Sequence, residues 1–198
     1  MPSLKQRFNQ YLPVVIDVET GGVNPETDAL LEIAAVFLDF DADGLLKATE
    51  TVAVHVEPLK GLRIHQKSLE ITGIKPDHPF RFAEPEDKSL QQIFKAINSA
   101  KKAAGCKRGM LIGHNAHFDL AFINAACQRH QITSPLHSFS VLDTVTLGML
   151  SYKTSILAQI LRNAGIKFDE KEAHSARYDA EKTAELFCKV FNSHDLGK

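Results

Sequence analysis

Apolar runs predict three β-strands in the first third of the chain. They cover residues 13–20, 31–40 and 51–56, and each contains several β-branched residues. The turn-forming stretches "GGVNPETD" and "DFDADG" follow the first and the second run. Such short connections favour an antiparallel meander of three strands.

The remainder of the chain alternates between helical periodicity and short apolar runs. A helical segment at 66–72 stops before Gly73, a residue suited to a left-handed helix end. Ser89 and Gln92 have the spacing of a capping box and predict the start of a helix that Gly105 closes. The pattern further predicts strands at 109–114 and 139–144 and helices at 118–130, 155–165 and 175–192.

This order of elements predicts the fold class. It indicates an α/β protein with one mixed sheet, in which three antiparallel strands are followed by parallel strands, flanked by helices. Hydrophobic residues make up 44% and charged residues 24% of the 198 residues, which is an ordinary balance for a globular chain. No repeat or shift in composition divides it, so we expect one domain over residues 1–198.

Charge and cysteine content limit the classes of function. A net charge of −1 argues against passive binding of nucleic acid by bulk charge, but leaves binding through metal ions or local basic patches open. The three cysteines are far apart and form no metal-binding spacing, as expected of small buried thiols in a reducing compartment. With no signal-peptide core and no apolar run of membrane-spanning length, we expect a cytoplasmic protein without a membrane partner.

Two carboxylates interrupt the first apolar run, "VVIDVETGG". Asp17 and Glu19 lie two positions apart on a predicted strand and therefore point to the same face. Like charges placed together raise each other's proton affinity, and a hard divalent cation with oxygen ligands would relieve the repulsion. For a single such pair, the favoured explanation is that one of the two carboxylates faces solvent at the strand end.

Two further acids come shortly after predicted strands or at the start of helices. Asp119 ends the stretch "GHNAHFD", and Asp179 ends "HSARYD" in the first turns of the last helix. Either one alone is explained by the favourable interaction of an acid with a helix N-terminus.

Taken together, "IDVETGG", "HNAHFD" and "HSARYD" resemble, in order and spacing, the three motifs of the DEDD exonucleases. His174 lies five residues before Asp179, as in the histidine branch, and Ser175 stands where the other branch has tyrosine. The resemblance implies a ribonuclease H-like fold and two Mg²⁺ ions per active site, with Mn²⁺ as a substitute. It further implies that His174 is the general base and that Glu19 takes part in catalysis. The metal ligands that it implies are Asp17, Glu19, Asp119 and Asp179.

The flanking segments "TDALLEIAAV", "GHNAHFDLAF" and "EAHSARYDAEKTAELFC" are similar to the ribonuclease T family. This likeness implies a 3′→5′ exoribonuclease that trims short 3′ overhangs of tRNA and of 5S and 23S rRNA precursors and also digests DNA 3′ ends. It implies a homodimer in which each subunit lends a basic patch to the partner's active site. That patch would include Arg7, Lys102 and Arg108, although a solvated helix end explains a similar cluster.

Members of the ribonuclease T family stack phenylalanines on the terminal bases. Phe118 and Phe139 stand in matching places, whereas Val23 and Ile71 occupy positions where aromatic residues are expected. Base–aromatic stacking contributes roughly 1–3 kcal/mol per base. The two aliphatic residues therefore predict an altered terminal-base preference and weaker binding, with catalysis retained.

Two alternatives remain open at this point. One is a DNA-directed exonuclease of the proofreading type or an oligoribonuclease, because carboxylates that contact phosphate and metal do not sense the 2′-hydroxyl. The other is a nucleic-acid-binding module that has lost its chemistry, which predicts a substitution among the four acids or His174; none is present.

Overall fold

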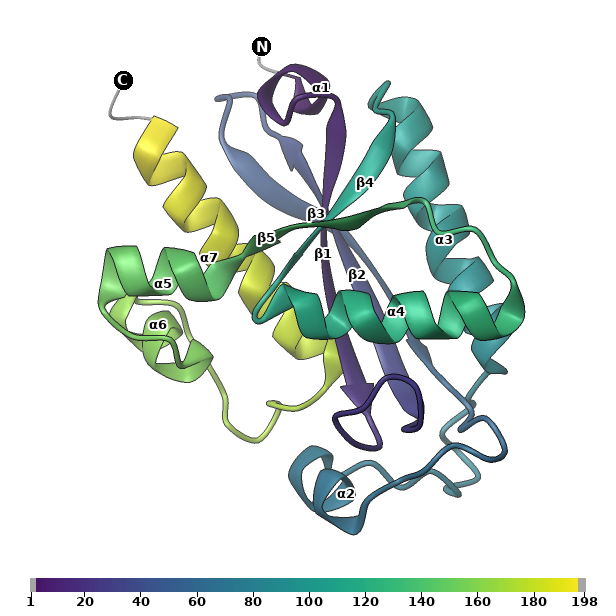
Figure 1. The fold of residues 1–198 in the computed structure, drawn as a ribbon. Helices are drawn as coiled ribbons and strands as arrows, with labels where there is room; N and C mark the ends of the chain where they lie inside the picture. The colour runs from purple at the N-terminus through teal and green to yellow at the C-terminus, as the bar shows by residue number, and fades with distance from the viewer. Residues whose placement is uncertain (1–2, 196–198) are drawn as a thin grey trace.

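A mixed five-stranded sheet forms the centre of the computed structural model, which describes residues 3–195 (Figure 1). The strand order is β3-β2-β1-β4-β5, with β1–β3 antiparallel and β4 and β5 parallel to β1. The bounds are β1 Tyr11–Thr20, β2 Leu30–Phe40, β3 Leu46–His55, β4 Arg108–Gly113 and β5 Leu136–Asp143. The expected fold class is thereby confirmed.

Burial explains why the sequence pattern predicted β1 and β2 but did not predict the start of β3. The residues Val14, Val15 and Ile16 are buried because helices cover both faces of the central strands. The edge strand β3 begins at Leu46, earlier than predicted, with an exposed stretch at 47–50. Such a polar edge segment carries no apolar signal.

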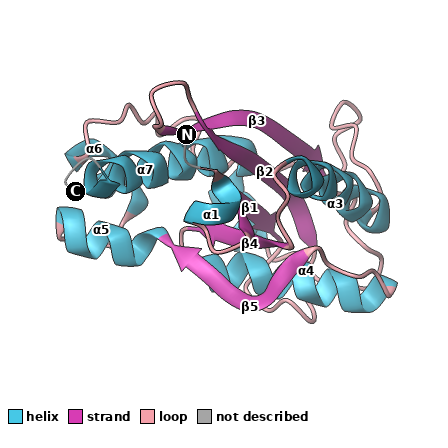
Figure 2. Ribbon diagram, turned by 90° about the horizontal axis from the view of Figure 1, so that it is seen from above, coloured by secondary structure: helices cyan, strands magenta, loops and turns pink. Residues whose placement is uncertain are grey.

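Helices cover the two faces of the sheet. Figure 2 shows α3 and α7 on opposite sides, with α4 beside α3 and with α5 and α6 beside α7. The bounds are α1 Leu4–Arg7, α2 Gln66–Thr72, α3 Glu86–Ala103, α4 Ala116–His130, α5 Thr144–Tyr152, α6 Leu157–Asn163 and α7 Ala176–Asp195. In the described part of the chain, no helix is long and apolar enough to cross a membrane.

The predicted capping box at the start of α3 is wrong. The helix begins at Glu86, and Ser89 lies inside its first turn, where its hydroxyl donates to the carbonyl of Pro85 at 3.1 Å. At the observed start of the helix, the buried Glu86 carboxylate accepts from Arg129 Nη2 at 2.9 Å and contacts His130 Nε2 at 2.8 Å. No local spacing reports such a contact.

The helix α5 was missed because its sequence resembles a continuation of β5. The strand ends at Asp143, whose side chain caps α5 by accepting from the Val145 amide at 2.9 Å. Within α5, a Cβ on Gly148 would lie 2.2 Å from Ile160 Cδ1, so only glycine fits against α6 here. Position 144 therefore belongs to a helix and not to the predicted strand 139–144.

The cysteines are free thiols, as expected. Cys127 and Cys188 are buried, and Cys106 is half-buried. Burial raises the pKa of Cys127 to about 11 and that of Cys188 to about 12, so both remain protonated and unreactive at neutral pH.

Candidate active site

The four predicted acids meet at the carboxyl end of β1. The pairing of β1 with β4 ends at Val15, so the last part of β1 extends past its parallel neighbour. The free N–H of Val18 donates instead to Asp119 Oδ1 at 2.9 Å. This bond ties the acid on α4 to the strand between Asp17 and Glu19.

Asp119 is placed by the sharp turn that opens α4. Asn115 adopts a left-handed conformation, with φ of 65°, immediately before the helix. The Asp143 carboxylate at the end of β5 accepts from the amides of Asn115 at 3.2 Å and Ala116 at 3.0 Å. Asp143 therefore positions the start of α4 as well as capping α5. Sequence reasoning missed this role, although an Asp-Thr pair before "VTLGML" is an N-cap signal.

Asp179 and His174 come together at the start of α7. The His174 amide donates to Asp179 Oδ2 at 2.9 Å, and His174 itself has a φ of 66°, in the left-handed region that non-glycine residues seldom occupy. A ring nitrogen of His174 and carboxylate oxygens of Glu19 and Asp179 all lie within 4.8 Å of one another. The His174 side chain is exposed and open to solvent.

Glu32 links this histidine segment to the sheet. It lies opposite Glu19 in the β1–β2 pair, and its carboxylate accepts from the Ala176 amide at 3.2 Å. The other oxygen of Glu32 contacts His55 Nδ1 at 2.9 Å. Glu32 was read as part of a strand, and its only sequence signal is a charge inside an apolar run.

The acids strongly perturb one another. Burial raises the pKa of Asp17 well above its ordinary value, and the charges of Asp119 and Glu19 raise it further. Burial likewise raises the pKa of Glu19 to about 8, with Asp179 and Glu32 adding to the effect. Burial also raises the pKa of Asp119 to about 8 and raises that of Asp179. A site of this kind favours a bound positive charge.

The residues present fit a divalent metal ion. Asp179 Oδ1 is buried and has no hydrogen-bond partner, which is costly unless a ligand satisfies it. It belongs to the Glu19–His174–Asp179 group, and the donor set is dominated by carboxylate oxygens, which hard cations prefer. An ion here would both satisfy this oxygen and cancel the repulsion.

Of the four predicted base-binding residues, three are exposed and Phe118 packs against a neighbouring ring. Val23, in the loop after β1, is 82% exposed, and Ile71, on α2, is 51% exposed. Phe118 directly precedes Asp119 and packs on Phe122, with ring centroids 4.9 Å apart. Phe139 is exposed in the middle of the edge strand β5, where its ring meets His137 at 4.6 Å. No contact of the described residues links Phe139 to the acids.

The predicted basic residues lie at the opposite end of the sheet from the acids of their own chain. Arg108 begins β4 and pairs with Tyr11, six residues before Asp17, which at ~3.3 Å per residue is about 20 Å along the strand. Figure 1 shows α1, which ends at Arg7, at this same end. Lys102 lies in the last turn of α3.

The raised pKa values predict that the metal-free protein loses stability as pH rises. Folded Glu19 retains a proton that the unfolded chain releases, so the free energy of unfolding falls between the ordinary pKa of 4.5 and about 8. Glu19→Gln lacks this titrating group. In chelator, its melting temperature is therefore expected to exceed that of wild type by a margin that grows as pH rises through this range. A saturating divalent cation, which binds the folded wild type, is expected to cancel the trend.

Scanning calorimetry measures both effects. Glu50→Gln, on the exposed part of β3, serves as the matched control. A difference between Glu19→Gln and wild type that stays constant with pH would contradict this account of the electrostatics.

Comparison with solved structures shows where this fold occurs. E. coli exonuclease I in complex with a dT13 oligonucleotide matches with a TM-score of 0.73 at 18% identity, over 94% of this chain and 42% of that protein. Its zinc-bound complex with single-stranded DNA matches with 0.73 at 19% identity, over 94% and 41%. A 3′-exonuclease that recognises the 3′ end of a histone mRNA stem-loop matches with 0.72 at 18% identity, over 91% and 63%.

These matches show that the chain has a ribonuclease H-like exonuclease fold, and it spans less than two thirds of the length of each of these proteins. The sequence profile of the exonuclease family matches residues 14–187, a span that holds all four acids and His174. The chain therefore belongs to the exonuclease family, within the DEDD exonuclease superfamily.

Proposed function

We propose that this protein is a metal-dependent 3′→5′ exoribonuclease, formed by a single domain over residues 1–198. Its substrates are short 3′ overhangs of structured RNAs, as in tRNA end turnover and the maturation of 5S and 23S rRNA, and it also acts on DNA 3′ ends. The observation that carries the proposal is the convergence of four acids and His174 at one end of β1. This convergence also argues against a module that binds nucleic acid without chemistry.

The acids Asp17, Glu19, Asp119 and Asp179 would hold two Mg²⁺ ions, with Mn²⁺ as a substitute. Carboxylate oxygens suit these hard ions better than Zn²⁺, although the related exonuclease I has been seen with zinc. When bound, the two ions stabilise the charge on the attacking and leaving oxygens of an in-line displacement at phosphorus.

The chain's own residues supply the proton transfer. His174 accepts a proton from the attacking water, and its backbone is fixed for this task by the bond to Asp179. A Glu19 oxygen lies within 4.8 Å of the His174 ring nitrogen and orients the same water by accepting its other hydrogen. The water oxygen bonds to phosphorus as the bond from phosphorus to the 3′ oxygen breaks. The 3′ oxygen of the shortened strand takes up a proton from solvent, and a nucleoside 5′-monophosphate is released.

The choice of RNA rests on the likeness of the flanking segments to ribonuclease T. Related structures bind either kind of nucleic acid, since exonuclease I carries dT13 and the 3′-exonuclease recognises an mRNA stem-loop. The second candidate is therefore a DNA-directed 3′→5′ exonuclease or an oligoribonuclease, which has the same catalytic acids.

Trimming of a tRNA with a short 3′ tail and of a single-stranded DNA of matched length tests the proposal. We expect faster trimming of the tRNA, loss of activity in chelator and recovery with Mg²⁺. Asp119→Asn is expected to fold normally, because an amide oxygen still accepts from Val18, and to lose roughly a thousandfold or more in rate. Asp43→Asn, in the exposed β2–β3 turn, is the control. Faster digestion of the DNA would favour the second candidate, and an active Asp119→Asn would refute the metal assignment.

A homodimer explains the position of the basic residues. Because Arg7, Lys102 and Arg108 lie far from the acids of their own chain, we expect them to serve the active site of a second subunit. Light scattering should then give twice the mass of one chain. The double variant Lys102→Ala, Arg108→Ala should remain dimeric, with a higher KM and a weaker dependence of binding on salt.

Mixing subunits tests this sharing directly. Asp119→Asn lacks an acid but keeps the basic patch, and the Lys102→Ala, Arg108→Ala variant keeps the acids. After the two are unfolded and refolded together, the mixture is expected to be more active than either variant alone. A stable monomer, or a mixture with no recovery, would exclude the shared site.

Terminal-base preference tests the aliphatic positions. In the double variant Val23→Phe, Ile71→Phe, restored stacking should tighten binding of the 3′ end by about 1–3 kcal/mol per stacked base and change the ranking of substrates ending in A, C, G or U. The control is Leu150→Phe, at an exposed position of α5. Val145→Phe would not serve, because Val145 is half-buried and a larger side chain there would disturb packing. Unchanged affinity and ranking would remove Val23 and Ile71 from the base-binding site.

A further inference from the structure

The loop 21–28, which carries Val23, is joined to the segment that leads into α2. The Ala29 amide donates to the Arg63 carbonyl at 2.9 Å, and the Arg63 amide donates to the Thr27 carbonyl at 2.8 Å. The His65 amide donates to the Gly21 carbonyl at 2.7 Å. His65 is the N-cap residue of α2, the helix that carries Ile71.

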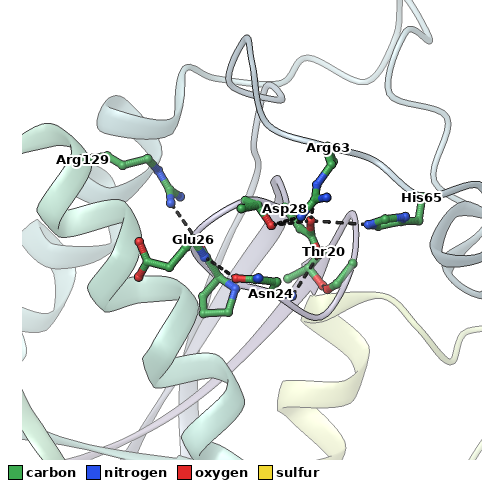
Figure 3. Close-up of polar contacts among 10 residues, drawn as sticks. Thr20, Asn24, Glu26, Asp28, Arg63, His65 and Arg129 are labelled. Carbon is green, nitrogen blue, oxygen red and sulfur yellow. Dashed lines mark hydrogen bonds and ion pairs between the residues drawn. The ribbon is translucent and has the colours of Figure 1, made fainter.

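A single buried carboxylate lies at the centre of this junction (Figure 3). Asp28 is 2% exposed, and its oxygens accept from the Asn24 amide at 2.9 Å and the Thr27 hydroxyl at 3.0 Å. Arg63 Nε and His65 Nε2 approach the same carboxylate at 3.4 and 3.5 Å. Asp28 therefore contacts both the loop and the start of α2.

The charge on Asp28 is well compensated. Burial alone would raise its pKa, but the bonds from Asn24 and Thr27, with the nearby His65 and Arg63, lower it below the ordinary value. An ionised group in this position holds its partners more strongly than a neutral one does. The loop backbone is in direct contact with it, because a Cβ on Gly22 would lie 2.2 Å from Asp28 Oδ2.

A second contact fixes the outer turn of the loop to α4. Arg129 Nη1 donates to the Pro25 carbonyl at 2.9 Å (Figure 3). Arg129 is itself paired with the buried Glu86 at 2.9 Å. Polar contacts thus hold the loop on both sides of Val23, whose side chain is 82% exposed.

We propose that Asp28 is a positioning residue for recognition of the 3′-terminal nucleosides of a single-stranded nucleic acid. It holds Val23, four residues after Glu19, and the helix that carries Ile71 in one fixed arrangement, so that binding requires no ordering of the loop. This inference rests on the proposed function. Asp28 is too buried to touch the substrate and acts through Val23 and Ile71.

A preformed site of this kind improves affinity by reducing the ordering cost of binding, and it leaves the chemical step unchanged. The substitution Asp28→Asn keeps the shape of the side chain and removes its charge. We expect KM to rise roughly fivefold and kcat to stay within about twofold of wild type. The substitution weakens substrate binding and leaves the transition-state interactions at the acids unchanged. Differences in rate among substrates ending in A, C, G and U should narrow.

A double-mutant cycle separates this role from a general effect on stability. If Asp28 acts through Val23, then Asp28→Asn should have a much smaller effect on the Kd for the oligonucleotide in a Val23→Ala background than in wild type. Affinity is measured in chelator with a 5′-labelled oligonucleotide, so that no cleavage intervenes. Arg162→Ala, which removes an exposed arginine paired with Glu170 on the α6 side of the molecule, is the control.

Arg63→Ala provides a second route if Asp28→Asn fails to fold. Arg63 lies on the surface, so its removal loosens the junction without opening the interior. Combined with Val23→Ala, Arg63→Ala should show the same non-additive effect on affinity for the oligonucleotide. The dependence of binding on salt should stay unchanged. Additive effects in the cycle, a fall in kcat without a change in KM, or a weaker salt dependence from lost phosphate contact would each overturn the inference. If wild type trims the oligonucleotide and these variants bind it normally, only this inference fails and the proposed function stands.

Discussion

The mutual repulsion of four carboxylates at the end of β1 is the constraint on which the rest of the structure depends. The sheet order places β1 between β2 and β4, so acids from β1, α4 and α7 arrive at one point from both faces of the sheet. Backbone N–H groups offset part of the cost, with Val18 donating to Asp119 and His174 donating to Asp179. The unsatisfied oxygen of Asp179 and the repulsion that raises the pKa values of the acids remain. The packing of the folded core must outweigh this energetic cost until a cation binds.

Local signals predicted the elements whose ends are set locally. The helix at 66–72 was predicted with its observed bounds, because Gly73 adopts the left-handed conformation, with φ of 68°, that ends it. The helix α5 was not predicted, since Thr144 was assigned to the preceding strand and the cap that Asp143 makes on this helix was not recognised. At the start of α3, Glu86 pairs with Arg129, 43 residues away in sequence, and no local pattern reports this contact.

Within the site, too, some residues were predicted from the sequence and others were not. The acids on β1 were predicted from their spacing, and the remaining acids and the histidine from a resemblance in motif order. The residues that hold them in place, Glu32 and Asp143, were not predicted. Their role lies in bonds to Ala176 and Ala116, which the topology brings close and the sequence does not. Glu32 was visible as a charge within an apolar strand and Asp143 as an N-cap signal, but neither signal names the partner residue.

On the proposed assignment, the residues for chemistry lie at the end of β1 and the residue for recognition of the chain end lies in the loop that follows. Glu19 closes the acidic group, and Val23 follows four residues later in the loop held by Asp28, so the covalent chain fixes the distance between them. The loop backbone is fixed by Asp28 and Arg129, whereas the side chain at position 23 is almost free of contacts and 82% exposed. On the proposed assignment, a change of residue there would alter what the terminal base meets and leave the backbone that carries Glu19 in place. For this reason an aliphatic residue at position 23 is compatible with an unchanged arrangement of the four acids.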